Sequence, residues 1–555
     1  MAKLNIVLYE PEIPANTGNI GRTCVATGTR LHLIEPLGFR LNEKQIKRAG
    51  MDYWKDLDVT TYVNYQEFLE KNPGAKIYMA TTKGQNVYTE VSYEEDCYIM
   101  FGKETYVQRR ALLKKKLGSG VLLFLGNDDY GLNYESNTFR YRQDSTFLYY
   151  FGLPFAGLSA IIDIDDDKEI IFGDELTIDD IVWMGVQPTL KEKSERVGVT
   201  QTLPSAEIMN YLHKCVQKGK AIHYLPPYRA EHKLKLMDWL GIPPARQEGS
   251  IPFIRAVIAQ RNYKSAEEIV EIEKACDVTA DMHITAMRVL RPGMYEYEVV
   301  AEMNRVAEAN NCELSFATIA TINGQTLHNH YHGNKVKSGD LFLIDAGAEV
   351  ESGYAGDMSS TIPADKKFTT RQREVYEVQN AMHLESVKAL RPGIPYMDVY
   401  ELSARVLVEG LKGLGLMKGN AADAVQEGAH ALFYPHGLGH MMGLDVHDME
   451  NLGEIWVGYN GEPKSTQFGR KSQRLAVPLE PGFVHTVEPG IYFIPELIDM
   501  WKAEKKFTDF INYDKVETYK DFGGIRNEED YLITETGARR LGKKIPLTPE
   551  EVEAV

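Results

Sequence analysis

The sequence lacks the features of a membrane protein, of a disulfide-stabilised protein and of a dedicated nucleic-acid-binding protein. No stretch of its 555 residues approaches 18 consecutive apolar residues, so no membrane span is expected. Its five cysteines are scattered without a C-x-x-C pair, which argues against a disulfide framework and a thiolate zinc site. The formal net charge of −17 argues against nucleic-acid binding, because affinity for phosphates depends on clustered Lys and Arg.

The start of the chain also lacks the features of a secretory signal. The short apolar run in MAKLNIVLYEPEIP is interrupted by Glu10 and Pro11, and no small-residue cleavage site follows it. A cytoplasmic protein is therefore expected. The composition, 43% hydrophobic and 25% charged, is that of an ordinary globular chain. Its length indicates three to four domains.

The chain divides into three pieces and a polar tail. Residues 1–99 alternate short β-type runs with helical stretches, a pattern typical of an α/β fold. Residues 100–258 form an α+β segment with two strand-rich stretches, GVLLFLG and AIIDIDDDKEIIFG. The third piece, 264–541, begins with a charged amphipathic helix, and residues 542–555 follow as a polar tail.

The third piece contains an internal repeat. Residues 282–306 and 382–406 match at an offset of 100, with Met, His, Leu-Arg-Pro-Gly, Val and Arg-Val recurring in register. Pro and Gly end a helical run, so each copy is expected to be helix, break, helix. Strand-forming segments follow both copies. The duplication therefore predicts one domain of two similar halves, with a site between them.

Ligand-type side chains occur at strand-like positions in both halves. In the first half, Asp345 ends one apolar run and Asp357 begins the next, and the intervening ESG is a turn. A hairpin would bring these two carboxylates side by side. A lone Asp after a strand is more often a turn former. However, an acid that closes an apolar strand is costly to bury unless it is paired or metal-bound.

The second half supplies three histidines and two glutamates, namely His436, His440, His447, Glu488 and Glu528. The two histidines of HGLGH have the spacing of a zinc-binding pair on a helix, but the two glycines of this motif disfavour a helix. Because several separate strand ends all present ligand-type groups, the turn-former explanation weakens for the set as a whole.

Four motifs in order, IDAGAEVESGYAGD, HGLGHMMGLDVHD, LEPGFVHTVEPGIY and GGIRNEEDYLITETG, carry a family resemblance. Through them, residues 100–541 strongly resemble the aminopeptidase P/prolidase group of metallopeptidases. The resemblance implies an aminopeptidase P N-terminal α+β domain followed by a catalytic domain of the pita-bread fold. The Asp345–Asp357 spacing of 12 is one longer than in many members, and the ESG turn accommodates the extra residue.

The resemblance also implies roles for the residues. It implies five ligands for two metal ions, namely Asp345, Asp357, His440, Glu488 and Glu528, of which Asp357 and Glu528 would bridge both ions. His328, His436 and His447 match histidines that contact the substrate and stabilise the transition state. Arg526 matches an arginine beside the bridging glutamate.

The chemistry of this ligand set agrees with those roles. Four carboxylates and one imidazole form a hard, oxygen-rich set that favours Mn²⁺. Their charge of −4 balances two divalent ions, which would supply a bridging hydroxide and polarise the scissile carbonyl. A creatinase-type or catalytically silent binding protein of the same fold is the rival interpretation. Five intact ligand positions argue against the silent version.

The family implies Xaa-Pro peptides as substrates. An Xaa-Pro bond has no N–H and a fixed φ, so peptidases that hold substrates by strand-like hydrogen bonds lose a donor there. The overall pattern fits an aminopeptidase, whereas the segment 493–526 resembles prolidases, which cleave only dipeptides. Trp183 matches a tryptophan that in relatives can reach the site of the neighbouring subunit, which implies a homo-oligomer, a dimer or a tetramer. Ordinary core or interface packing is the alternative for Trp183.

The first piece resembles a different family, the SPOUT-class tRNA 2′-O-methyltransferases. Asn16, Gly18 and Arg22 match that family's first motif. A small basic patch follows, which suits tRNA phosphates or is equally a solvated helix face, formed by Arg40, Lys44, Lys47 and Arg48. The later segments that bind S-adenosylmethionine in relatives are absent. We therefore expect a truncated fragment that binds neither the methyl donor nor tRNA, in preference to a bifunctional RNA-modifying enzyme.

The two resemblances join at MFGKET, residues 100–105, which is plausible in both families. Met100 resembles the start of an aminopeptidase P. Either a gene fusion or a chimeric reading of two genes would produce this join.

Overall fold

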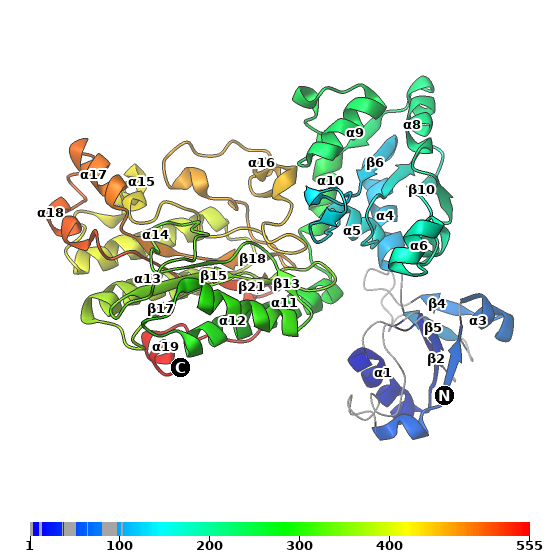
Figure 1. Cartoon of the computed structure of the whole chain (residues 1–555), viewed down its shortest axis with the longest axis horizontal. Helices are drawn as coiled ribbons and strands as arrows, with labels where there is room; N and C mark the ends of the chain where they lie inside the picture. The colour runs from blue at the N-terminus through cyan, green and yellow to red at the C-terminus, as the bar shows by residue number, and fades with distance from the viewer. Residues whose placement is uncertain are drawn as a thin grey trace. The chain divides into compact units, whose positions relative to one another are not determined.

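The structure is a computed structural model of the chain, drawn in Figure 1. It describes residues 4–9, 11, 14–35, 37, 52–63, 65–79, 97–101 and 104–555. The basic patch of Arg40, Lys44, Lys47 and Arg48 lies outside these residues. The chain separates into two compact units, Met1–Phe253 and Ile254–Val555.

The first sheet of the N-terminal unit is five-stranded and parallel, with the order β3-β2-β1-β5-β4. Its strands are β1 (Asn5–Tyr9), β2 (Arg30–Ile34), β3 (Val59–Tyr62), β4 (Ile77–Met79) and β5 (Tyr98–Phe101). The α/β fold predicted for this piece is confirmed. The predicted boundary between residues 99 and 100 falls inside β5, whose Met100 pairs with Val7 of β1.

Apolar residues on both faces of this sheet are covered. On one face, Val7 and Ile34 pack with Phe68 of α3 (Tyr65–Lys71). On the other face, Leu8 and Leu33 pack with Cys24 and its neighbours in α1 (Pro14–Thr27). A helix on each face gives this part of the chain a layered α/β arrangement with two small cores.

The second sheet of the N-terminal unit is mixed, with the order β11-β10-β9-β6-β12. Its strands are β6 (Val121–Leu125), β9 (Ser159–Asp163), β10 (Lys168–Phe172), β11 (Gln201–Leu203) and β12 (Ile222–Tyr224), so both predicted strand-rich stretches form strands. A separate hairpin comprises β7 (Gly131–Tyr134) and β8 (Asn137–Thr138). The helices are α4 (Glu104–Leu117), α5 (Ser145–Phe151), α6 (Ile178–Met184), α7 (Leu190–Glu195), α8 (Glu207–Gln217) and α9 (Ala230–Leu240). Helix α10 (Ile251–Arg261) runs across the division between the units.

The C-terminal unit is built on two helix pairs that correspond to the sequence repeat. The first pair is α11 (Ala266–Val289) and α12 (Glu296–Ala309), and the second is α13 (Thr370–Ala389) and α14 (Tyr396–Gly413). In both pairs the Arg-Pro-Gly break falls between the helices, as predicted. Ser265 begins α11 and Thr369 begins α13, each with a capping box that satisfies the first N–H groups.

Each helix pair is followed by its own sheet. The first sheet contains β14 (Ile319–Thr321), β15 (Leu341–Ala346) and β17 (Met358–Pro363), and the second contains β18 (Val484–Val487), β21 (Glu529–Ile533) and β22 (Ala538–Arg540). Two smaller pairs are β13 (Glu313–Leu314) with β16 (Ala348–Glu349), and β19 (Gly490–Tyr492) with β20 (Gly524–Arg526). Helix α11 packs on β15 and β17, and α13 packs on β18 and β20. A bridge between Ser359 and Glu528 joins the halves.

The predicted hairpin of the first half is present. Strands β15 and β17 pair antiparallel, with Asp345 opposite Ser359. The two arms approach closely at Gly347, where a Cβ would lie 1.9 Å from the carbonyl oxygen of Gly356. Only glycine fits there, and this approach holds the hairpin closed next to its two aspartates.

The C-terminal segment 542–555 differs from the polar tail that the sequence predicts. It contains α19 (Pro549–Glu553), which begins at a capping box of Thr548 and Glu551. Glu553 accepts a hydrogen bond from the N–H of Phe368 at 3.0 Å and pairs with Arg373 at 2.9 Å. The charged residues therefore anchor this segment on α13.

The remaining helices of the C-terminal unit are α15 (Ala421–Glu427), α16 (Glu454–Val457), α17 (Pro495–Ala503) and α18 (Tyr513–Val516). The last two lie within the segment 493–526. Among the helices of the described residues, none is both long and apolar enough to cross a membrane.

Candidate metal centre

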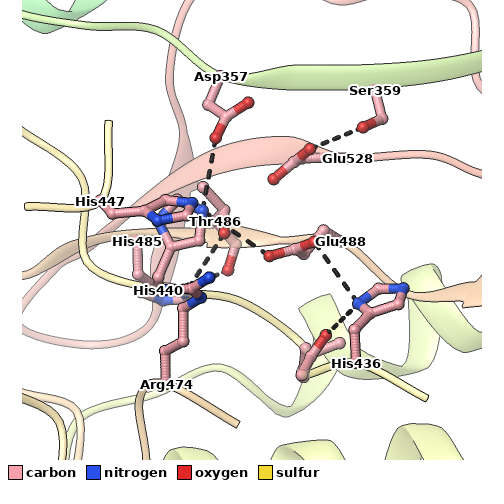
Figure 2. A network of polar contacts seen from close by, with 12 residues as sticks. Asp357, Ser359, His436, His440, His447, Arg474, His485, Thr486, Glu488 and Glu528 are labelled. Atoms are coloured by element: carbon pink, nitrogen blue, oxygen red, sulfur yellow. Dashed lines mark hydrogen bonds and ion pairs between the residues drawn. The ribbon is translucent and has the colours of Figure 1, made fainter. Parts of the chain in front are cut away.

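Three buried side chains from three elements meet in the C-terminal unit. Asp357 immediately precedes β17, His440 lies on the loop before β18, and Glu528 lies between β20 and β21. One ligand atom from each lies within 4.8 Å of the other two. Figure 2 shows these side chains pointing toward one another. The structure thus brings together three of the five predicted ligands.

The other two predicted ligands lie beside this cluster. Glu488 immediately follows β18, and its Oε1 is 3.7 Å from Nε2 of His440. Asp345 lies on β15 and accepts a hydrogen bond from Nη2 of Arg526 at 2.6 Å. Glu488 therefore lies next to a member of the cluster, and Asp345 is held by Arg526, two residues before Glu528.

The ring of His440 is oriented by its backbone surroundings. Its Nδ1 donates to the carbonyl of Met441 at 3.1 Å, which leaves Nε2 without a proton in the neutral ring. That Nε2 lies 3.4 Å from Oδ2 of Asp357. The backbone N–H of His440 donates to Oγ1 of Thr486 at 3.2 Å, which ties the loop to β18. Such an orientation is typical of a metal-ligating histidine.

The carboxylates of the cluster repel one another. Burial, together with the charge of Asp345, raises the pKa of Asp357 to about 8. Burial and the charges of Asp357 and Asp345 also raise the pKa of Glu488 to about 8, against the opposing effect of Arg526. The pKa of Glu528 is raised well above its ordinary value by burial and by the same acids. Without a cation, these groups resist ionisation.

Two oxygens of the cluster lack a partner within the described part of the chain. Oδ1 of Asp357 and Oε1 of Glu528 are buried and accept no hydrogen bond there. An orphaned buried acceptor is destabilising, and a divalent cation would satisfy both oxygens. The donor set is four carboxylates and one imidazole, so these residues fit hard divalent metal ions.

Arg526 connects the cluster to a tyrosine that the sequence analysis missed. Its Nε donates to Oγ of Ser359 at 2.9 Å, and its Nη1 donates to the hydroxyl of Tyr492 at 2.8 Å. The Tyr492 hydroxyl in turn donates to Nε2 of His436 at 2.9 Å, because Nδ1 of that ring donates to the carbonyl of Gly437. This chain fixes His436 beside Glu488, 3.7 Å away.

The other two predicted histidines lie on separate loops. The ring centroid of His447 is 4.1 Å from that of His440. His328 is exposed on the loop after β14, and its pKa is lowered by partial burial and by the charge of Arg526, against the opposing charge of Asp345. His447 therefore lies against one predicted ligand, His440, and His436 lies beside another, Glu488.

The remaining predicted positions lie in the N-terminal unit. Trp183 lies on α6 and is 87% exposed, so it is not a core residue of its own unit. Asn16, Gly18 and Arg22 all lie on α1. The side chain of Asn16 and the surroundings of Gly18 lie outside the described part of the chain.

Comparison with known proteins agrees with the three pieces. Residues 270–535 match the model of the metallopeptidase family M24, and residues 106–223 match the aminopeptidase P N-terminal domain. The chain is 32% identical over 471 residues to the Xaa-Pro aminopeptidase of Escherichia coli K12, covering 82% of this chain and 97% of that protein. The chain belongs to the M24 metallopeptidase family.

The M24 relatives include both exopeptidase types. The human Xaa-Pro dipeptidase is 30% identical over 424 residues, covering 75% of this chain and 84% of that protein. Among solved structures, the proline aminopeptidase P II of Yersinia pestis matches with a TM-score of 0.68 and 29% identity, over 82% of this chain and 99% of that one. A zinc-substituted E. coli aminopeptidase P in complex with product matches with a TM-score of 0.67 and 29% identity, over 82% and 98%.

The N-terminal piece matches a separate family. Residues 3–117 match the model of the SpoU rRNA methylase family. The fusion and the multidomain α/β architecture expected from the sequence are therefore confirmed. The two matched regions overlap at residues 106–117, which lie within α4.

Proposed function

We propose that this M24 metallopeptidase is an Xaa-Pro aminopeptidase, which releases the N-terminal residue from peptides with proline in second position. The observation that supports this most is the cluster of Asp357, His440 and Glu528, buried at the junction of the two repeated halves. The similarity to an aminopeptidase extends over 97% of that enzyme and includes the N-terminal domain.

We propose that the cluster binds two divalent ions, Mn²⁺ in preference. Asp345, Asp357, His440, Glu488 and Glu528 would hold them, with Asp357 and Glu528 shared between both. The unpartnered oxygens of the two shared residues support that assignment. Two such ions would supply an acidified water as the nucleophile and a Lewis acid for the scissile carbonyl.

The side chains around the ligands would bind the substrate and stabilise the transition state. His447, whose ring lies beside that of His440, is suited to contact the reacting peptide. His436 stays neutral because burial and the charge of Arg526 lower its pKa to about 3, so it acts as a hydrogen-bonding group. Exposed His328 is suited to contact the peptide. Arg526 holds Asp345 in place through their ion pair.

A dipeptidase is the second candidate function, and two observations favour it. The human dipeptidase is 30% identical to this chain. The segment between Glu488 and Glu528 contains α17 and α18 and resembles prolidases. The aminopeptidase assignment is preferred because its similarity covers more of both chains, 82% and 97% against 75% and 84%.

Three further assignments accompany this proposal. The proposed pieces are 1–99, 100–258 and 264–541, of which the first boundary falls within β5. Exposed Trp183 would contact a second copy of the chain, as a homo-oligomer requires. Residues 1–99 would contribute no methyl transfer, and neither S-adenosylmethionine nor tRNA is expected to bind.

The test is a peptidase assay of the Mn²⁺-loaded full chain on a Gly-Pro dipeptide, a longer Xaa-Pro peptide and its N-acetylated form. An aminopeptidase cleaves the longer free peptide and leaves the acetylated one intact. Cleavage of the dipeptide alone would identify a prolidase, and no cleavage of any Xaa-Pro bond would reject both assignments.

A further inference from the structure

A carboxylate outside the ligand set contacts the imidazole of His447. Glu450 begins the short helix η4 (Glu450–Leu452), three residues after His447, and its Oε2 is 2.5 Å from Nδ1 of that ring. Both side chains are about one-third exposed. The sequence analysis did not single out Glu450.

The hydrogen bond determines which nitrogen of His447 faces the site. An ionised carboxylate can only accept, so Nδ1 of His447 must carry the proton. Nε2 is then the nitrogen left for the substrate, and the ring can rotate only by breaking the bond to Glu450. Fixing a histidine by a carboxylate on its other nitrogen is a general way to set both ring orientation and tautomer.

The backbone between the two residues is held firmly. Met449, between Asp448 and Glu450, is fully buried and has a φ of 61°, which a residue other than glycine adopts only when its surroundings impose it. Asp448 pairs with Arg261 at 2.6 Å and with Lys264 at 2.8 Å, all three being buried. The turn that presents His447 and Glu450 together is therefore fixed at its centre.

Glu450 is itself anchored from its other side. Its Oε1 forms an ion pair with Arg474, and Arg474 also reaches Oε1 of Glu454 at 3.4 Å. Glu454 in turn pairs with Lys464. One carboxylate oxygen of Glu450 thus pairs with Arg474, and the other accepts the hydrogen bond of His447. Glu454 contacts the same arginine but not the histidine.

We propose that Glu450 is a positioning residue for His447, which holds the imidazole in one orientation and one tautomer for the substrate. The proposal rests on the proposed function, in which His447 contacts the reacting peptide. Glu450 is not one of the five proposed ligands and is assigned no contact with the substrate. The shared arginine makes Glu454 its matched control.

The kinetic test compares Glu450→Ala, Glu450→Gln, Glu454→Ala and His447→Ala in the Mn²⁺-loaded full chain, on a longer Xaa-Pro peptide. We expect Glu450→Ala to lower kcat about 10- to 100-fold with little change in KM and with metal content retained. Glu450→Gln keeps an acceptor for Nδ1–H and should recover part of that loss. Glu454→Ala should change kcat only about 2-fold, since it leaves the His447 contact intact.

The double variant separates positioning from general damage. If Glu450 acts through His447, adding Glu450→Ala to His447→Ala should change kcat no further, because the ring that Glu450 positions is already absent. Additive losses, unchanged kcat in Glu450→Ala or loss of metal from that variant would each overturn the proposal.

A second readout does not depend on activity. In the full chain labelled with ¹⁵N-histidine, the His447 resonances, assigned from His447→Ala, should report the Nδ1-protonated tautomer. Glu450→Ala should shift them toward a tautomer mixture, whereas Glu454→Ala should not. An identical His447 pattern in all variants would overturn the proposal. If the wild type cleaves no Xaa-Pro peptide, the proposed function fails, and this measurement still decides the role of Glu450 at the histidine.

Discussion

Ser359 and Glu528 are joined twice across the two halves of the catalytic unit. The N–H of Glu528 donates to the carbonyl of Ser359 at 3.0 Å, and the Ser359 hydroxyl donates to Oε2 of Glu528 at 2.8 Å. Asp357 lies two residues before Ser359. The register between the halves therefore sets the separation of the two acids that we assign as shared ligands, and the cluster forms only when both halves are folded against each other.

The first prediction concerns those two acids. Asp357→Ala or Glu528→Ala should abolish turnover, because each change removes a ligand that we assign to both ions. The measurement is kcat on an Xaa-Pro peptide, together with metal content per chain. Asp281→Ala, which removes only an exposed ion pair with Lys543, is the control. Substantial activity in either ligand variant with two metals still bound would contradict the assignment.

The second prediction concerns the three histidines that are not assigned as ligands. His328→Ala, His436→Ala and His447→Ala should each lower kcat/KM, by about 100-fold where the ring stabilises the transition state. All three variants should retain two metals per chain, measured by elemental analysis after gel filtration. Loss of metal from one of them would instead make that histidine a ligand.

The third prediction is a pH dependence of stability in the metal-free chain. Asp357 and Glu488 have pKa values raised to about 8 in the folded state, against ordinary values of 3.8 and 4.5. Between about pH 4.5 and 8 the folded chain therefore binds more protons than the unfolded chain, and stability falls as pH rises. Thermal melts of the chain treated with chelator should show a higher Tm at pH 5 than at pH 8, relative to the Asp357→Asn, Glu488→Gln double variant.

Metal binding should reverse that trend. Because the ligands must lose their protons to bind a cation, loading at pH 7 should release protons. Titration calorimetry in buffers of different ionisation enthalpy measures that release, which should decline above pH 8. A metal-free chain whose Tm rises from pH 5 to pH 8 relative to the double variant would show that these carboxylates are ionised without a cation.

The fourth prediction concerns residues 1–99. We expect them to contribute nothing to catalysis and to be the least stable part of the chain, since the later segments of the methyltransferase that they resemble are absent from the sequence. A chain beginning at Met100 should keep full peptidase activity and resist proteolysis better than the full chain. Equilibrium dialysis of the full chain should detect no binding of S-adenosylmethionine. Collapse of activity on deletion, or measurable methyl-donor binding, would overturn this expectation.

The helices and strands were predicted best where a sequence pattern repeats or where a short motif determines the local structure. The Arg-Pro-Gly breaks marked both helix pairs, and the ESG turn marked the hairpin of Asp345 and Asp357, because glycine and proline act on their own neighbourhood. β3 was missed, since VTTY has little apolar alternation and its middle residues are exposed. Tyr492 and Glu450 were missed because each contacts a residue that lies far away in the sequence. Tyr492 contacts Arg526, 34 residues later, and Glu450 contacts Arg474, 24 residues later.

The place of β5 in the first sheet has a consequence for synthesis on the ribosome. β5 is the last strand of that sheet to be made, yet it lies between β1 and β4, and among the described strands β4 pairs with β5 alone. At about 5–20 residues per second, roughly 1 to 4 s separate the synthesis of β4 from that of β5. During that interval β5, the described strand that pairs with β4, has not yet been made. The first residues of α4 are synthesised soon after β5. Nascent chains stalled before Tyr98 should therefore be cut readily by protease within β4, whereas chains stalled after α4 has left the exit tunnel should be protected there.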